Sequence, residues 1–277
     1  MAMNLRALVL CGNGTNCEVE TAHAVRTAGA DEVQILSVWE LLAGHDTIDA
    51  YDFLCLPGGF LDGDHLGSAR AGAFRFAHGK PGAGRDPIRV QLDRFLDAGG
   101  VIIGICNGFQ LLVKLGLLPS RTWEPRVTLT HNLNGRFEDR WVTLAADPES
   151  PCVFTTGLRT LDLPIRHGEG RLVAANDALL KTILKDHLAP LKYVDPATGL
   201  PTETYPLNPN GSPGGIAALC DPTGRIFGLM PHPEAFSHYT NHPRWTREFL
   251  DGAPENQEGT GILLFRNAVD WLRKNHG

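Results

Sequence analysis

Short apolar runs rich in valine, isoleucine and leucine recur along this chain, and helix-like segments separate them. Strands that are buried on both faces give continuous apolar runs of this kind, because helices cover both sides of their sheet. The pattern therefore predicts an α/β fold with a mostly parallel sheet. The predicted strands are Arg6–Cys11, Val33–Val38, Asp52–Leu56, Val101–Ile105 and Ile226–Met230.

Three of the segments between and after these runs carry helix signals. Thr15 and Glu18 form a capping-box pattern at the start of one predicted helix. Pro87 suits the first turn of a second helix, which the glycine pair at 99–100 would end. The last helix, at 261–275, has one apolar side and should pack back on the sheet.

The middle of the chain has a different pattern. Between residues 119 and 225 short alternating runs are broken by proline and glycine, which is typical of antiparallel strands. We expect these strands to be added at the edge of the α/β sheet rather than to form a separate domain. Three further stretches are expected to be long loops, of the kind that serves as lids or partner contacts: 63–87, 195–215 and 237–259.

Composition excludes several classes of protein. The 25 basic and 31 acidic residues give a formal charge of −6, which argues against a protein that binds nucleic acid or anionic membranes. No apolar stretch is long enough for a signal-peptide core or a membrane helix, so we expect a cytoplasmic protein. The six cysteines contain no C-x-x-C pair, which argues against a zinc site and a disulfide framework.

The stretch Val101–Gln110 is the most informative for function. It is a predicted buried strand that ends in the sequence Gly-Ile-Cys-Asn-Gly and continues into a helix-like segment. G-x-C-x-G is the nucleophile-elbow pattern with cysteine in place of serine, in which the glycines permit a tight, strained turn. Cys106 would lie at a helix N-terminus, which favours the thiolate, and the Asn107 amide could stabilise an oxyanion. A buried structural cysteine at a strand end is the alternative.

A cysteine nucleophile needs a base and a group that orients the base. His232 and Glu234 are two residues apart, so both side chains project to the same side of an extended backbone. Pro233 keeps His232 out of the helical region. His232 would take the thiol proton and later protonate the leaving amine, while Glu234 would hold the imidazole in one tautomer. Taken alone, His232 is more typical of a surface or core histidine whose hydrogen-bonding groups are satisfied.

A glycine pair follows a third predicted strand. Gly58 and Gly59 come directly after the apolar run that ends at Leu56 and Pro57. One interpretation is a tight turn. The functional interpretation is that this backbone, free of side chains, lets a carbonyl substrate approach closely, and that it offers the second oxyanion amide.

Together these motifs resemble a class I glutamine amidotransferase. The order is P-G-G-F from Pro57, G-I-C-N-G-F-Q from Gly104 and P-H-P-E from Pro231. The closest resemblance is to the glutaminase subunit of phosphoribosylformylglycinamidine synthase (PurQ-type). That family also shows H-G-E-G, here from His167, and an N-terminal G-x-N-C-E-like turn, here from Gly14. Because the motifs span nearly the whole chain and must converge on one sheet edge, we expect residues 1–277 to be a single amidotransferase domain.

The resemblance implies a fold, a site and a partner. The fold is the class I glutaminase fold, a flavodoxin-like sheet flanked by helices. The implied residues are a triad, two oxyanion amides and a group near bound glutamine: Cys106, His232 and Glu234; Gly59 and Asn107; Gly58, Phe60, Gln110, His167 and Glu169. Ammonia would pass to a large formylglycinamide ribonucleotide synthetase subunit, with a small accessory subunit left open. ATP and magnesium would belong to that partner, since this chain has no G-x-x-x-x-G-K-[ST] loop and no implied metal ligand.

Two segments depart from the family pattern. Residues 61–65 read L-D-G-D-H where the family usually has S-Y-G-D-Y, and Ala235 stands where the family usually has arginine. Neither change touches the triad. Three alternatives therefore stay open: an amidotransferase for another synthetase, a stand-alone Cys-His-Glu amide or peptide hydrolase, and a non-enzymatic subunit that kept the fold.

Overall fold

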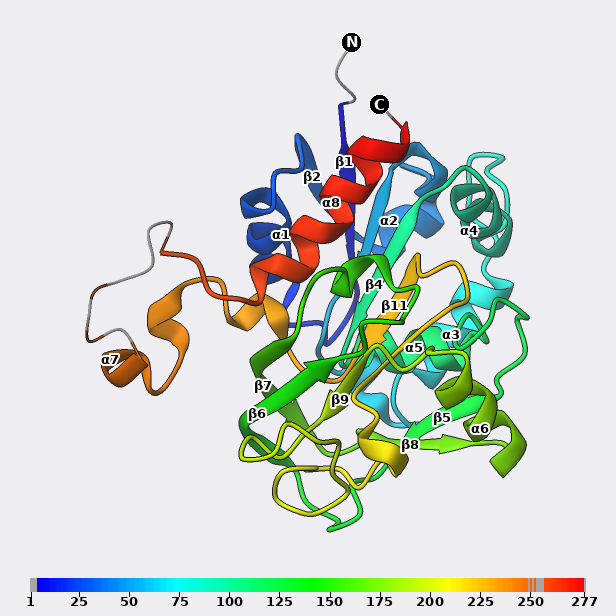
Figure 1. Cartoon of the computed structure of the whole chain (residues 1–277). Helices are drawn as coiled ribbons and strands as arrows, with labels where there is room; N and C mark the ends of the chain where they lie inside the picture. Colours follow the sequence, from blue (N-terminus) through cyan, green and yellow to red (C-terminus); the bar gives the residue numbers. More distant parts are fainter. Residues whose placement is uncertain (1–3, 249, 251, 253–256, 277) are drawn as a thin grey trace.

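A six-stranded sheet forms the centre of the molecule in the computed structural model, which describes residues 4–248, 250, 252 and 257–276 (Figure 1). Its strand order is β10-β11-β4-β3-β1-β2. All neighbours pair in parallel except β10, which lies antiparallel to β11 at one edge. The bounds are β1 Arg6–Cys11, β2 Glu32–Ser37, β3 Phe53–Leu56, β4 Val101–Ile105, β10 Ala218–Cys220 and β11 Ile226–Leu229. The five strands predicted from apolar runs are confirmed to within a residue at each end.

Helices flank this sheet, and they pack in two groups. Helix α1 contacts α8, whereas α3 contacts both α4 and α5. The bounds are α1 Glu18–Thr27, α2 Val38–Ala43, α3 Arg70–His78, α4 Ile88–Asp97, α5 Asn107–Lys114, α6 Asp177–Lys185, α7 Trp245–Glu248 and α8 Ile262–His276. The predicted α/β fold is confirmed. No helix in the described part of the chain is long and apolar enough to cross a membrane.

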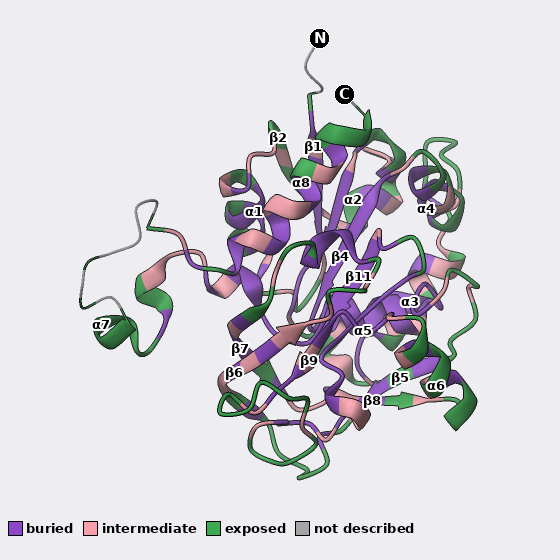
Figure 2. Cartoon of the chain, in the orientation of Figure 1, coloured by how far each residue is buried: buried purple, intermediate pink, exposed green. Residues whose placement is uncertain are grey.

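The core lies around the central strands. Strands β3, β4 and β11 are buried along their whole lengths, and seven of the eight residues of α5 are buried as well (Figure 2). Helix α5 can lie this close to the sheet because Gly108 faces the Leu56 backbone, where a Cβ atom would collide with the carbonyl oxygen. The strand-to-helix turn that carries Cys106 is thus anchored in the most buried part of the molecule.

The antiparallel strands of the middle segment are present, but most of them do not extend the central sheet. They form two small sheets, β5-β8 and β7-β6-β9, and only β10 takes an edge position in the large sheet. The bounds are β5 Val127–Thr130, β6 Glu138–Ala146, β7 Thr160–His167, β8 Arg171–Ala174 and β9 Leu191–Tyr193. The physical reason is that β6 and β7 pair with each other over eight positions and so satisfy their own backbone hydrogen bonds.

The capping-box prediction at Thr15 and Glu18 was wrong. Helix α1 begins at Glu18, Cys17 is its N-cap residue without a side-chain cap, and the Thr15 hydroxyl accepts from the Gly12 amide at 3.0 Å instead. The reason is a tertiary contact: Thr15 pairs with Gly59 in an isolated antiparallel bridge, so its backbone belongs to that pairing and not to the start of the helix. Pro87 is the N-cap residue of α4, one position before the helix, and Gly99 follows that helix with φ +99°.

The predicted loops differ in their outcome. The stretch 63–87 contains helix α3, which buries Gly72, Ala73 and Phe76, so the loop prediction was wrong there. The stretch 195–215 holds a short 3-10 turn at Pro213–Gly215 and an isolated antiparallel bridge from Pro201 to Val194. The stretch 237–259 holds a 3-10 turn and α7, and six of its residues (249, 251 and 253–256) lie outside the described residues.

Candidate active site

The turn that carries Cys106 has the backbone of a nucleophile elbow. Cys106 lies between β4 and α5 with φ 51° and ψ −102°, a conformation that non-glycine residues rarely adopt. Gly104 faces the carbonyl oxygen of Gly108, which an added Cβ would approach to 2.7 Å. Both glycines of the motif are therefore required for this turn, and the thiol lies at the N-terminus of α5.

His232 and Glu234 form a buried pair beyond the end of β11. Nδ1 of His232 donates to Oε1 of Glu234 over 2.6 Å, and the two side chains are 3% and 1% exposed. The segment is not extended, as the spacing had suggested, because Pro233–Ala235 forms a 3-10 turn. The turn closes through a bond from the Phe236 amide to the Pro233 carbonyl, and the His232 amide donates to Pro164 of β7 at 2.8 Å. The small sheet thus helps to position the imidazole.

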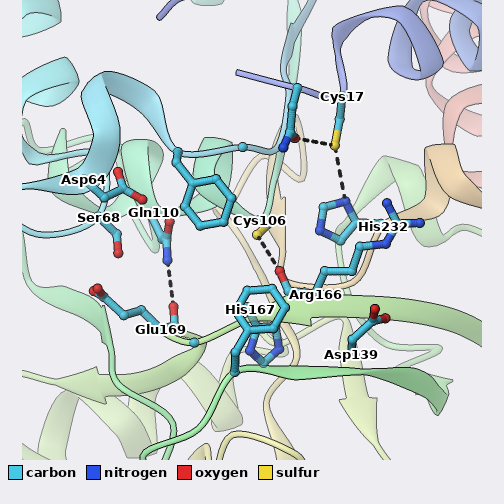
Figure 3. A pocket seen from close by; sticks show the side chains of 15 residues that line it. Cys17, Asp64, Ser68, Cys106, Gln110, Asp139, Arg166, His167, Glu169 and His232 are labelled. Atoms are coloured by element: carbon cyan, nitrogen blue, oxygen red, sulfur yellow. Dashed lines mark hydrogen bonds between the residues drawn. The ribbon is translucent and has the colours of Figure 1, made fainter. Parts of the chain in front are cut away.

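The environment of His232 favours its protonated form. Burial opposes protonation, but the Glu234 carboxylate and the Cys106 thiol outweigh it, so the pKa of His232 is raised well above its usual value. Nε2 of His232 is buried and has no hydrogen-bond partner in the described part of the chain. With Nδ1 turned to Glu234, Nε2 is the ring nitrogen left for proton exchange with Cys106, whose Sγ lies 3.7 Å from the Arg166 carbonyl oxygen (Figure 3).

The two candidate oxyanion amides come from neighbouring strand ends. Strands β3 and β4 pair in parallel, so Gly59 and Asn107 follow adjacent strands. The bridge between Thr15 and Gly59 uses the amides of Asn16 and Phe60, which donate to Gly58 and Gly14, and leaves the Gly59 amide out of those bonds. Asn107 is the first residue of α5, where backbone N–H groups have no partner within the helix.

A side-chain network holds the turn of Asn107 against its surroundings. Oδ1 of Asn107 accepts from the Leu61 amide at 2.9 Å, and Nδ2 donates to Oε1 of Gln110 at 2.9 Å and to the Asp64 carboxylate at 3.1 Å. Nε2 of Gln110 in turn donates to the Glu169 carbonyl oxygen at 2.7 Å. The nucleophile turn, the segment after Gly59 and the H-G-E-G segment are therefore connected by hydrogen bonds.

A pocket of about 380 Å³ opens above Cys106. Fifteen residues line it: Asn16, Cys17, Gly59, Phe60, Asp64, Ser68, Cys106, Gln110, Phe137, Asp139, Arg166, His167, Gly168, Glu169 and His232. Of the residues singled out from sequence, seven are in this group. The other three do not line the pocket but contact residues that do: Gly58, Asn107 and Glu234. A Cβ at Gly58 would lie 2.8 Å from Cε1 of His232, so this glycine makes room for the imidazole.

His167 is a neutral, buried member of the pocket. Its Nδ1 donates to Oδ1 of Asn132 at 3.1 Å, which leaves Nε2 buried without a partner in the described part of the chain. Burial, and then the charge of His232, lowers the pKa of His167 to about 3. Asn132 also accepts from the Gly170 amide at 3.0 Å and donates to the His167 carbonyl at 2.8 Å, so it shapes the H-G-E-G turn.

Comparison with known proteins identifies the family. Residues 4–272 match the family described as "CobB/CobQ-like glutamine amidotransferase domain". The chain belongs to this family of glutamine amidotransferases. "Phosphoribosylformylglycinamidine synthase subunit PurQ" of Dehalococcoides mccartyi is 41% identical over 98% of this chain and 98% of its own length. This amidotransferase is therefore of the PurQ type, as its motifs predicted.

Two further comparisons extend this result. "Phosphoribosylformylglycinamidine synthase" of Drosophila melanogaster is 36% identical over 98% of this chain, and the matched part is 20% of that protein. The solved structure described as "Structure of PurLQS from Thermotoga maritima" contains a chain with a TM-score of 0.67 and 28% identity, which covers 98% of this amidotransferase and 100% of that chain. The fold prediction is thus confirmed over 98% of the chain.

Several pocket residues of this amidotransferase were missed from sequence. Asp64 and Ser68 lie in the stretch that was expected to be a loop, and Asp139 and Arg166 face each other across β6 and β7. Asp64 is the aspartate that residues 61–65 share with the family pattern S-Y-G-D-Y, and Arg166 directly precedes the H-G-E-G motif, whereas no local pattern marks Ser68. Cys17 was noted only as part of the N-terminal turn. Its Sγ lies 3.9 Å from Nδ1 of His232, and burial raises the pKa of its thiol.

Proposed function

We propose that this amidotransferase hydrolyses glutamine with Cys106, His232 and Glu234 as its catalytic triad. One observation carries the assignment: Cys106 on the nucleophile elbow and His232 line the same pocket, and His232 is paired with the buried carboxylate of Glu234. The resulting ammonia serves phosphoribosylformylglycinamidine synthesis.

The reaction follows from the positions of the three side chains. Nε2 of His232 takes the thiol proton, and Sγ of Cys106 attacks the carboxamide carbon of glutamine. As the tetrahedral intermediate collapses, the C–N bond breaks, His232 returns the proton to the leaving nitrogen, and ammonia departs. Water, deprotonated by His232, then hydrolyses the thioester to glutamate and restores the thiol. Glu234 stabilises the imidazolium that forms in both half-reactions.

Backbone amides stabilise the oxyanion in this mechanism. One is the backbone amide of Asn107, the residue after the nucleophile. The other is the backbone amide of Gly59, which follows the adjacent strand. N–H donors of this kind lower the barrier when they are oriented toward the oxyanion before its charge develops. Phe60, Gln110, His167 and Glu169 surround the glutamine in this scheme.

The ammonia acceptor is a large formylglycinamide ribonucleotide synthetase, with ATP and magnesium bound on that partner. The Drosophila relative supports a large partner, because the part of it that matches this chain is only a fifth of that synthase. The Thermotoga structure is named PurLQS, and this name supports a separate large subunit. It is also compatible with a small accessory subunit.

Reconstitution with the synthetase tests the proposed function. Cys106→Ala should abolish product formation from glutamine and leave synthesis from added ammonia intact. Cys11→Ala, a cysteine outside the pocket, should keep both activities. Glutamine turnover by Cys106→Ala would contradict the nucleophile assignment.

The isolated chain distinguishes this function from the alternative of a stand-alone amide hydrolase. We expect it to be a poor glutaminase until the synthetase binds, so ammonia release from glutamine should rise on adding the partner. High turnover without any partner would favour the hydrolase. Co-purification with a ligase other than formylglycinamide ribonucleotide synthetase would point to a different synthetase.

A further inference from the structure

Cys17 brings a second thiol into the pocket, beside the catalytic imidazole. Its Sγ lies 3.9 Å from Nδ1 of His232, and Figure 3 shows this side chain directed at the ring. The spacing of the cysteines argued against a zinc site, but these two residues are 215 positions apart and meet only in the fold. The proposed mechanism uses the thiol of Cys106. The pocket therefore holds a buried thiol that this mechanism does not use.

Cys17, His232 and Glu234 gather their polar atoms around one ring nitrogen. All three residues are buried, and one ligand atom of each lies within 4.8 Å of the other two. Sγ of Cys17 and Oε1 of Glu234 both face Nδ1 of His232, at 3.9 and 2.6 Å. Oε2 of Glu234 is buried and has no hydrogen-bond partner in the described part of the chain. A buried polar atom is normally paired, so this oxygen points to a bound partner.

Two other clusters of possible metal ligands lack this geometry. They are Asp147, Glu149 and His187, and Asp162, His242 and Glu248. In each, one carboxylate lies at Nδ1 of the histidine and the other at Nε2. One cation cannot join both carboxylates to the ring there, because the two nitrogens point in different directions. Lys192 and Arg244 also pair with these carboxylates. The cluster at Cys17 is therefore the better metal site.

The donor set at Cys17 fits zinc. Zn²⁺ binds thiolate, imidazole and carboxylate ligands in a tetrahedral arrangement, often with water in the fourth position. Zn–S and Zn–N bonds of about 2.3 and 2.0 Å place sulfur and nitrogen about 3.6 Å apart. Sγ of Cys17 and Nδ1 of His232 are already 3.9 Å apart. The Glu234 oxygen must move from 2.6 Å to about 3.4 Å from Nδ1. Since Cys17 and His232 line the pocket, water can reach the fourth position.

We propose that Cys17, Nδ1 of His232 and Glu234 form an inhibitory binding site for a thiophilic divalent cation of the zinc class. The cation replaces the thiol proton of Cys17 and the Nδ1 proton of the imidazolium, and both protons leave to solvent. His232 then keeps one proton, at Nε2, and has no lone pair to accept the proton of Cys106. The metal site itself is independent of the proposed function, whereas its inhibitory effect rests on that function.

Cobalt(II) tests the site in the isolated full-length chain. Co²⁺ occupies tetrahedral zinc sites, and a thiolate bound to it gives a near-ultraviolet charge-transfer band that oxygen and nitrogen ligands do not give. The wild type should show this band, and Cys17→Ser should lose it. Cys106→Ser should keep the band, because the nucleophile is not a ligand. Cys11→Ser, a change outside this pocket, should keep it as well.

Two further measurements guard against a variant that fails to fold. Glu234→Gln leaves the thiol in place and should weaken Co²⁺ binding at least about tenfold, since changes even beyond the direct ligands cost about 10- to 100-fold. Zn²⁺ should raise the Tm of the wild type but not that of Cys17→Ser, because a cation that binds only the folded state stabilises it. Thermal unfolding without metal shows whether Cys17→Ser is folded. If it is not, Cys106→Ser and Glu234→Gln decide the assignment.

The assembled complex tests the inhibition. Zn²⁺ should lower product formation from glutamine and leave synthesis from added ammonia unchanged, because that reaction bypasses His232. In Cys17→Ser, product formation from glutamine should keep the same fraction of its own metal-free rate at all these Zn²⁺ concentrations. An equal loss with glutamine and with ammonia would place the inhibitory cation on the partner and overturn the inhibitory role.

The outcomes separate the metal site from the proposed function. A wild-type chain without the band, or a band that persists in folded Cys17→Ser, overturns the metal site. A band that disappears in Cys106→Ser makes the nucleophile a ligand and overturns the site in this form. The band does not depend on turnover, so its presence in a complex that releases no ammonia from glutamine would refute the proposed function and leave the metal site standing.

Discussion

The side chain of Asn107 accepts a hydrogen bond from the backbone amide of Leu61 at 2.9 Å, although 46 positions separate the two residues. Asn107 follows the nucleophile directly, and Leu61 lies two residues after Gly59. This single contact joins the two strand ends that carry the candidate oxyanion amides. A change in the segment after Gly59, for example when a partner binds, would thus be transmitted to the nucleophile turn.

Asn107→Ala should loosen this connection. The Leu61 amide, which is buried, would lose its acceptor at a cost of about 1–3 kcal/mol in the free energy of unfolding. We also expect kcat to fall more than KM changes, because the two oxyanion amides would no longer be held together. Urea denaturation and steady-state kinetics measure the two effects. Asn275→Ala, near the C-terminus, is the control and should leave both values unchanged. Wild-type kcat in Asn107→Ala would refute the coupling.

Glu234→Gln should lower kcat by at least about 100-fold, because the imidazolium formed during catalysis would lose its counter-charge. The sign of the pH effect follows from the raised pKa of His232. Loss of the Glu234 charge should lower that pKa and shift the corresponding inflection in kcat/KM to lower pH. Glu248 forms a similar pair with His242 at 3.0 Å outside the pocket, so Glu248→Gln is a matched control with wild-type kinetics. An unshifted pH profile in Glu234→Gln would be incompatible with this pairing.

Gly58→Ala should impair catalysis without unfolding the protein. The new Cβ would lie 2.8 Å from Cε1 of His232, so the imidazole must move. A displacement of about 1 Å in a catalytic group can cost about 100-fold in rate, and we expect a loss of that order in kcat. Thermal unfolding should show that the fold persists. Activity at the wild-type level would mean that the imidazole does not need this position.

His167 should make the protein less stable in acid. Its pKa is about 3 in the folded state, below the value of about 6.5 for an unperturbed histidine, so the unfolded chain binds the proton first. The free energy of unfolding should therefore fall as pH drops from about 6.5 toward 3. The slope from this one group approaches about 1.4 kcal/mol per pH unit.

His167→Asn provides the comparison, because its side-chain amide can still donate to Asn132. Urea midpoints measured between pH 4 and 7 should show a smaller acid loss in this variant than in the wild type. His232, whose pKa is raised, acts in the opposite direction: its contribution is present below pH 6.5 and is lost as the pH rises through its folded value. Equal slopes in the two proteins would show that His167 is not held neutral.

The sequence by itself determined the central sheet and the identity of the nucleophile. Strands such as Val101–Ile105 are continuous apolar runs, and burial on both faces of a sheet selects for that local composition. The glycines beside Cys106 were equally informative, because the turn that they permit depends on backbone clashes within a few residues. A strand or a turn whose conformation depends on residues close together in the sequence can be predicted from that sequence.

Only the tertiary structure decided what lies around these elements. Thr15 matched a capping box, but it pairs with Gly59 and does not cap the helix. The pocket brings Cys17 beside His232, although 215 positions separate the two residues. Contacts of this kind exist only after the chain has closed long loops, so no local pattern marks them. Cys106 could therefore be recognised from its neighbours, whereas the residues that surround its substrate had to be found in the fold.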